Sequence, residues 1–195
     1  MAAVTMVQAA VAAAPLAGQA SSGDRGVVVP FPGGTVVAAI DGLGHGDAAS
    51  KAAAAAVLAI SEDPAQPVDE LVRRCHARLR HTRGAVMTVA SFGSRYMTWV
   101  GVGNVDGILV RATGVEAVNT RGGIVGFQLP LLSPRRFDVQ PGDTLVLTTD
   151  GIRHGFRSAV DGRAPQVIAD AILAGFGKAT DDACVVVARY VGGGA

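Results

Sequence analysis

Charged side chains are few in this 195-residue sequence, where they make up 17% of all residues and leave a formal net charge of +1. Proteins that gather nucleic acid or an anionic membrane carry a strong basic field on at least one face. We therefore expect neither nucleic acid nor a membrane surface as a partner. Long apolar runs are also missing, because no stretch reaches the ~20 residues that are needed to span a bilayer.

Cysteine is nearly absent as well. The two cysteines, Cys75 and Cys184, lie far apart in the sequence and show no metal-ligand spacing. Each follows an apolar pattern, so we expect two small buried side chains. A disulfide framework is excluded, and its absence favours a reducing cytoplasm as the location of the protein.

A secretory leader is not expected at the N-terminus. Residues 1–20 are rich in alanine, but no Lys or Arg precedes the apolar stretch, and Gln8, Pro15 and Gly18 interrupt it. We expect an opening edge strand over residues 4–13 instead.

Apolar residues are plentiful at 49%, which is enough for a large core in a single domain over residues 1–195. Apolar periodicity predicts helices over residues 47–60, 67–81 and 166–174, the first with Asp47 as its N-cap. Successive strands joined by hairpins indicate antiparallel sheets with helices outside, an α+β fold. Short apolar runs predict these strands over residues 27–30, 35–40, 86–92, 96–102, 107–111, 115–118, 144–149 and 183–191, and a shaped loop over residues 121–134.

Aspartates stand at the ends of several predicted strands, next to glycines that let backbone carbonyls approach an ion closely. One of them opens the segment Asp-Gly-Leu-Gly-His-Gly (41–46), which leads into the first helix, whose N-terminus favours phosphate. The residues are Asp24 before strand 27–30, Asp41 after strand 35–40, Asp150 with Gly151 after strand 144–149, and Asp181 with Asp182 before strand 183–191.

Carboxylate and carbonyl ligands without His or Cys favour Mg²⁺ or Mn²⁺ over zinc. Several aspartates brought together would repel one another, and two divalent ions would remove that repulsion. Such a metal pair would also hold a hydroxide for in-line attack on phosphorus.

Two simpler interpretations compete with a metal centre. Asp-Gly is a common turn, so Asp150-Gly151 alone would indicate little. A nucleotide-binding loop could contain the glycines at 42 and 44, but Asp47 stands where the dinucleotide fingerprint needs its third glycine, and no Gly-Lys-Ser/Thr is present. The combination of acidic strand ends favours the metal centre.

As a set, four segments resemble the metal-dependent (type 2C-like, PPM) protein phosphatases, and within them the bacterial SpoIIE and RsbX branch. The segments are Ser-Gly-Asp (22–24), Ala-Ala-Ile-Asp-Gly-Leu-Gly-His-Gly (38–46), Thr-Thr-Asp-Gly (148–151) and Asp-Asp-Ala-Cys-Val-Val-Val (181–187). The likeness is greatest to RsbX-type stressosome feedback phosphatases, covers nearly the whole chain, and includes residues 74–85 and 102–109.

The resemblance implies a β-sandwich of two antiparallel sheets flanked by helices on both outer faces, with two Mn²⁺ or Mg²⁺ ions at one end. By position, Asp41 would bridge both ions and the Gly42 carbonyl would bind one of them. The further ligands implied are Asp24, Asp150 and Asp181, with Asp182 supporting them.

The sequence departs from the larger relatives at two places. They have a histidine directly after Asp-Gly, where this chain has Leu43. His45 lies two residues later and is a candidate general acid, with an exposed loop residue as the alternative interpretation. The phosphate-binding arginine of the larger relatives has no clear counterpart, although Arg25 is nearby in sequence.

The activity that the resemblance implies is hydrolysis of phosphoserine or phosphothreonine on a STAS-domain scaffold protein of stress signalling, opposing a kinase. The 121–134 loop and the basic face of helix 67–81 are candidates for recognising that partner, and each could equally be ordinary surface. The alternative is a catalytically silent copy of the fold that acts as a binding module in the same system. Retention of four carboxylates favours the enzyme.

Overall fold

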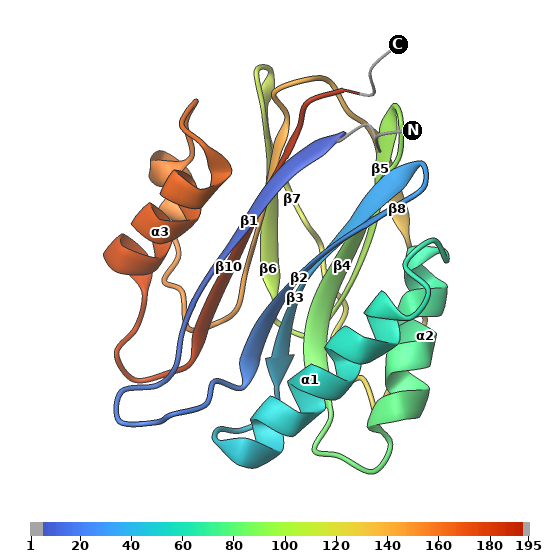
Figure 1. Ribbon diagram of the computed structural model, residues 1–195, viewed down its shortest axis with the longest axis vertical. Helices are drawn as coiled ribbons and strands as arrows, with labels where there is room; N and C mark the ends of the chain where they lie inside the picture. Colours follow the sequence, from blue (N-terminus) through green and yellow to red (C-terminus); the bar gives the residue numbers. More distant parts are fainter. Residues whose placement is uncertain (1–5, 193–195) are drawn as a thin grey trace.

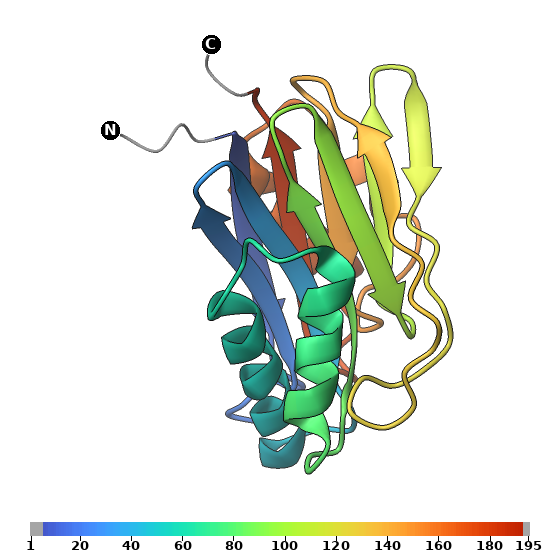
Figure 2. The same ribbon diagram turned by 90° about the vertical axis from the view of Figure 1, so that its right-hand side faces the viewer.

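The computed structural model describes residues 6–192, which form two five-stranded antiparallel sheets packed face to face (Figures 1 and 2). The first sheet has the order β1-β10-β9-β6-β7 and the second has the order β2-β3-β4-β5-β8. The strands are β1 (Val7–Ala14), β2 (Asp24–Phe31), β3 (Gly34–Gly42), β4 (Ala85–Phe92), β5 (Tyr96–Val102), β6 (Asp106–Arg111), β7 (Gly114–Ala117), β8 (Arg135–Asp138), β9 (Thr144–Thr148) and β10 (Ala183–Tyr190). The helices are α1 (Asp47–Ser61), α2 (Val68–Leu79) and α3 (Pro165–Phe176), with a short 3₁₀ helix, η1 (Phe156–Ala159).

Three apolar layers hold these elements together. The middle layer lies between the sheets and contains Val37, Trp99, Leu147 and Val186. Helices α1 and α2 cover the outer face of the second sheet, and α3 covers the outer face of the first (Figure 1). Strands β3 and β10 are therefore buried on both faces, which explains why their sequences are continuously apolar rather than alternating.

Helix α1 packs on the second sheet through small side chains. Its buried face consists largely of alanine, including Ala49, Ala52, Ala53 and Ala56. Alanine has high helix propensity and lets the helix axis lie close to the strands beneath it. The start of the helix is thereby held beside the end of β3, where Asp41 and Gly42 lie.

The expected sandwich with helices on both outer faces is confirmed, and so are the two buried free cysteines. The first strand starts at Val7, while residues 1–5, where part of the expected strand fell, lie outside the described residues. The prediction that Asp47 caps α1 is wrong: Gly46, at φ 74°, is the N-cap and Asp47 is the first helical residue. Within residues 6–192, no helix has the length and apolar character to cross a bilayer.

Strand β8 was not expected: it lies between the shaped loop predicted over residues 121–134 and the strand predicted over residues 144–149, where no element was predicted. Three of its four residues are exposed and two are arginines, so it has no apolar alternation. It pairs with β5 at the edge of the second sheet, where Arg136 stacks its guanidinium 3.6 Å from the ring centroid of Tyr96. Cross-strand contact, rather than local pattern, makes this segment a strand.

Candidate metal centre

The acidic strand ends meet at one end of the sandwich. Asp24 opens β2 and Asp41 lies near the end of β3, and the two are direct partners in the β2–β3 ladder. Asp150 follows β9 and Asp181 precedes β10, and these two strands are neighbours in the other sheet. The structure thus brings together acidic residues from both sheets, at the lower end of the molecule in Figure 1.

Asp182 fastens the two sheets to each other at this end. Its Oδ2 accepts a hydrogen bond from the Gly23 N–H and its Oδ1 accepts one from the Leu16 N–H, both at 2.8 Å. The side chain is buried, with 3% exposure. Because both carboxylate oxygens are used by backbone groups, Asp182 positions the segment that precedes Asp24. Its role in supporting the metal ligands stays a prediction.

Burial next to other carboxylates changes the acidity of the two aspartates in the β2–β3 ladder. Desolvation is the main cause that raises the pKa of Asp41 to about 8, followed by repulsion from Asp24, Asp150 and Asp181. Desolvation also raises the pKa of Asp24 to about 7, against a hydrogen bond from Thr149 that lowers it. Without a cation, the fold therefore disfavours ionisation of these two carboxyl groups.

The outer aspartates are held by different contacts. Asn104 donates an Nδ2 hydrogen bond of 2.9 Å to Oδ2 of Asp150, and the Lys178 ammonium donates to the backbone carbonyl of the same residue. Asp181 Oδ1 accepts the Asp182 N–H at 3.0 Å. Desolvation, followed by repulsion from Asp150, raises the pKa of Asp181. Sequence reasoning missed Asn104 and Lys178, because a single amide or amine in a loop carries no pattern.

Glycine is required at two positions of this centre by close backbone approach. A Cβ on Gly42 would lie 2.2 Å from the Ala49 carbonyl oxygen in the first turns of α1. A Cβ on Gly151 would lie 1.8 Å from the carbonyl oxygen of Asp182. Both contacts are with backbone atoms, which cannot move aside cheaply. The glycine of each Asp-Gly pair is therefore required by packing as well as by the turn.

His45 lies on the loop between Asp41 and α1 and is exposed. Its Nδ1 is 3.1 Å from the Gln19 Nε2, which belongs to the loop after β1. This contact sets the ring against the β1–β2 connection, and no hydrogen bond joins it to an aspartate among the described residues. Arg25 donates to the Ser50 hydroxyl on α1 at 3.1 Å, which ties its guanidinium to the helix.

The aspartates fit hard divalent cations. Asp24 Oδ2 is buried and accepts no hydrogen bond from residues 6–192, which leaves a carboxyl oxygen free to bind a cation. Across the same residues, no three His, Cys, Asp or Glu side chains are already arranged as a closed metal-binding group. A closed group is not required, because Mg²⁺ keeps several waters and takes only one or two carboxylates. Carboxylates that repel one another also stay further apart until a cation is present.

Comparison with known proteins identifies relatives of this arrangement. The model of the family Stage II sporulation protein E (SpoIIE) matches residues 32–191. A structure from work on the bacterial stressosome as a modular system adapted to control secondary messenger signalling is 26% identical, with TM-score 0.89, and the match covers 94% of this chain and 99% of that one. No curated protein matches the sequence.

Two further solved structures share the fold at lower identity. RsbX in complex with magnesium is 20% identical, with TM-score 0.85, covering 94% of this chain and 95% of that one. The PP2C phosphatase domain of SpoIIE from Bacillus subtilis, solved with a fragment of its regulatory domain, is 19% identical, with TM-score 0.82, covering 94% of this chain and 63% of that one.

Proposed function

Because the chain belongs to the SpoIIE family of PPM-type serine/threonine phosphatases, we propose that it hydrolyses phosphoserine and phosphothreonine with two Mg²⁺ or Mn²⁺ ions held by its acidic strand ends. The observation that carries this proposal is the buried, unsatisfied Oδ2 of Asp24 beside Asp41, whose pKa is raised to about 8. Two such groups in one ladder pair need positive charge to ionise.

In this proposal each residue has a separate task. Asp41 would serve as a ligand to both ions, the Gly42 carbonyl would bind one of them, and Asp24, Asp150 and Asp181 would complete the ligand set. When bound, the ions supply neutralising charge and activate a water for in-line attack on phosphorus.

Around these ligands, neighbouring residues fix their orientation. Asn104 orients the Asp150 carboxylate through its 2.9 Å hydrogen bond. Asp182 holds the turn that carries Asp24. His45 is close enough along the chain to approach a leaving oxygen once its contact with Gln19 is exchanged, and general acid catalysis of this kind contributes ~10²–10⁴-fold.

We propose a phosphorylated STAS-domain scaffold protein of stress signalling as the substrate. Support comes from the stressosome and RsbX structures, which match nearly the whole chain. A folded protein substrate needs a recognition surface beside the metal centre. The 121–134 loop offers one, because Phe127 and Leu131 on it are 80% and 81% exposed.

The loop adjoins the acidic centre through a short chain of backbone hydrogen bonds. Leu43 N–H donates to the Gly84 carbonyl at 3.1 Å, and Ala85 N–H donates to the Val125 carbonyl at 2.9 Å. The segment after Asp41 and the 121–134 loop are therefore both hydrogen-bonded to the same short stretch of backbone at residues 84–85.

The basic face of α2 is the weaker candidate for recognition. Arg73 pairs with Asp69 at 2.7 Å, and Arg74 and Arg78 both pair with Glu62. These guanidinium groups are already neutralised by acids of the same molecule, so they offer a reduced field to an acidic partner.

Hydrolysis of a phosphoserine STAS-domain protein and of its matching phosphopeptide, each with Mn²⁺ and with chelator, tests both parts of the proposal. We expect activity only with metal and a higher kcat/KM for the folded protein. Phosphotyrosine should be poor, because its longer rigid side chain misplaces phosphorus and in-line geometry tolerates little error. Equal values for protein and peptide would remove the STAS assignment. Failure to bind metal would favour the catalytically silent module.

A further inference from the structure

Strand β1 has a free edge that is made entirely of uncharged residues. It pairs with β10 on one side only, in the register Val7↔Tyr190. The N–H of Val191 donates to the Met6 carbonyl at 2.9 Å, so Met6 directs its backbone groups toward β10. Because alternate residues of an antiparallel strand face opposite edges, Val7, Ala9 and Val11 direct theirs outward.

Within residues 6–192, only one of these outward groups is engaged. The Val11 carbonyl accepts a 3.4 Å hydrogen bond from the Gln166 side chain of α3. The backbone groups of Val7 and Ala9 have no backbone partner outside the β1–β10 ladder within residues 6–192. Natural proteins usually protect such edges with charged residues or proline, and the segment 7–14 has neither.

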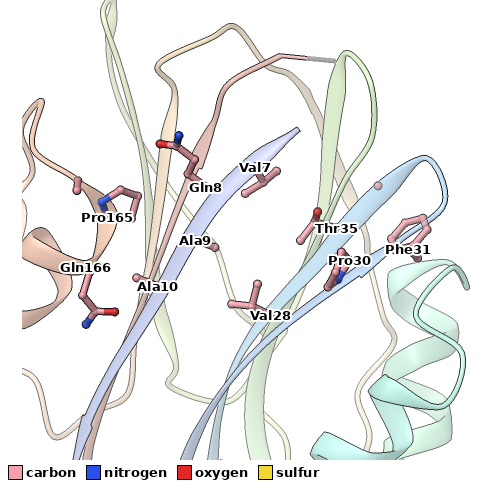
Figure 3. A pocket seen from close by; sticks show the side chains of 12 residues that line it. Val7, Gln8, Ala9, Ala10, Val28, Pro30, Phe31, Thr35, Pro165 and Gln166 are labelled. Atoms are coloured by element: carbon pink, nitrogen blue, oxygen red, sulfur yellow. The ribbon is translucent and has the colours of Figure 1, made fainter. Parts of the chain in front are cut away.

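The free edge opens into a groove of about 620 Å³ between β1 and the edge strand of the other sheet, β2 (Figure 3). The two strands approach closely at Gly26, where a Cβ would lie 2.5 Å from the Val11 side chain. Beyond this crossing they diverge, and Val28 and Pro30 form the inner wall (Figure 3). Pro165, at the start of α3, lies on the outer side of the same groove.

A strand added to β1 in the plane of the first sheet would enter this groove. Its side chains would alternate between the β2 wall on the inner side and α3 on the outer side. No residue that lines the groove is charged, so the entering strand must itself be uncharged. Segment 7–10 of β1, Val-Gln-Ala-Ala, has this character and faces the groove along the same stretch.

We propose that the occupant is β1 of a second copy of this chain, paired antiparallel about a two-fold axis at Gln8. In that register the N–H and C=O of each Val7 form hydrogen bonds with the C=O and N–H of Ala9 in the other copy. These are the outward backbone groups that are free in one copy. Gln8 then faces Gln8 of the other copy. A two-fold interface of this kind is self-complementary and closed, so it gives a dimer with one continuous sheet rather than a fibre.

This dimer does not depend on the proposed phosphatase function. The groove lies at the Val7 end of β1, whereas the acidic centre lies beyond its Ala14 end, ~20 Å away for a strand of this length. A loss of dimer and a loss of activity can therefore be measured separately.

Analytical ultracentrifugation of the full chain over a concentration series tests the proposal. We expect a reversible dimer. Gln8→Lys should abolish it, because like charges face each other directly. An equal mixture of Gln8→Lys and Gln8→Glu chains should restore a heterodimer. Ala9→Pro should raise the dissociation constant roughly 30-fold, because one hydrogen bond per copy is lost and each contributes roughly fivefold.

Ala13→Pro is the matched control. Ala13 lies on the same outward edge but beyond the paired segment, so this variant has the same intramolecular cost and should dimerise as the wild type does. A wild type that stays monomeric up to ~100 µM, which means an association free energy weaker than about 5.5 kcal/mol, would overturn the proposal. The groove would then be a candidate site for a strand of another protein. A dimer that tolerates both Gln8→Lys and Ala9→Pro would also overturn it.

Discussion

The carboxylate of Asp182 accepts the N–H of Gly23 at 2.8 Å, across 159 positions of sequence. This contact joins the segment before β10 in one sheet to the turn before β2 in the other. Asp24 follows Gly23 directly, so the position of one proposed metal ligand depends on an acid that is not itself among the proposed ligands.

Removing the Asp182 side chain should therefore lower the free energy of unfolding even when no metal is bound. Asp182→Ala leaves the half-buried N–H of Leu16 and the buried N–H of Gly23 unpaired, at roughly 1–3 kcal/mol each. We expect the free energy of unfolding in urea with chelator to fall by about 2–5 kcal/mol. Asp182→Asn keeps one acceptor and should lose about half as much. Asp170→Ala, on the exposed side of α3, is the control and should change little.

Substitution of the proposed ligands should lower turnover by different amounts. Asp41→Asn should lower turnover more than Asp24→Asn, because a bridging ligand supports both ions whereas a terminal ligand supports one. Mn²⁺ titrations monitored by calorimetry and by phosphopeptide hydrolysis measure the two effects together. Full turnover by the Asp41 variant, or by the wild type in chelator, would contradict the two-metal mechanism.

The metal-free protein should lose stability as the pH rises. An aspartate in an unfolded chain has a pKa of about 3.9, whereas the pKa values of Asp24 and Asp41 in the fold are raised to about 7 and about 8. Below pH ~4 both states are protonated and this contribution is fully present. Between pH ~4 and pH ~8 the folded state binds more protons, so the free energy of unfolding falls.

Urea unfolding at pH 5 and pH 8, with chelator and with Mn²⁺, measures this change. Mn²⁺ should stabilise the protein more at pH 8, where it meets ionised ligands. In chelator, Asp41→Asn should make the free energy of unfolding depend less steeply on pH. An unchanged slope in that variant would show that the Asp41 carboxyl ionises normally in the fold.

His45 should contribute modestly to turnover. Its ring is exposed and in contact with Gln19, so we expect His45→Ala to lower kcat on phosphoserine by less than about a hundredfold. Gln19→Ala is the matched variant, since it frees the ring without removing it. A larger loss for His45→Ala, with Mn²⁺ affinity intact, would identify it as the general acid.

The exposed apolar pair on the 121–134 loop should matter for protein substrates alone. Replacing both Phe127 and Leu131 by serine should raise KM for a folded phosphoprotein and leave hydrolysis of a short phosphopeptide unchanged. Val167→Ser, at an exposed apolar position on α3, is the control. An equal effect of the double variant on both substrates would mean that the loop shapes the metal centre rather than binding the partner.

Sequence reasoning recovered the elements that carry a strong local pattern. Strand 96–102 was placed with the bounds it has, and the acidic strand ends were correctly expected to meet, because strand termini of a sandwich gather at its ends. It could not find β8, whose arginines show no apolar alternation. It also could not find the role of Asn104, because the hydrogen-bond acceptor of that side chain, Asp150, lies 46 positions away in sequence. It left the basic face of α2 open between a partner site and ordinary surface, because Glu62, which pairs with Arg78, lies outside that helix.

The pairing of β1 with β10 has a consequence for synthesis of the chain. The ladder Val7↔Tyr190 joins the first described strand to the last, and the proposed ligands Asp24 and Asp181 also come from opposite ends of the sequence. Pairing over such separations is slow, because the entropy of closing the loop must be overcome before any contact rewards it. On the ribosome, β1 therefore waits without its partner until β10 emerges, and the proposed ligands cannot all come together before then. Chaperones that shield extended apolar segments should bind this nascent chain once β1 has emerged and stay bound until β10 pairs with it.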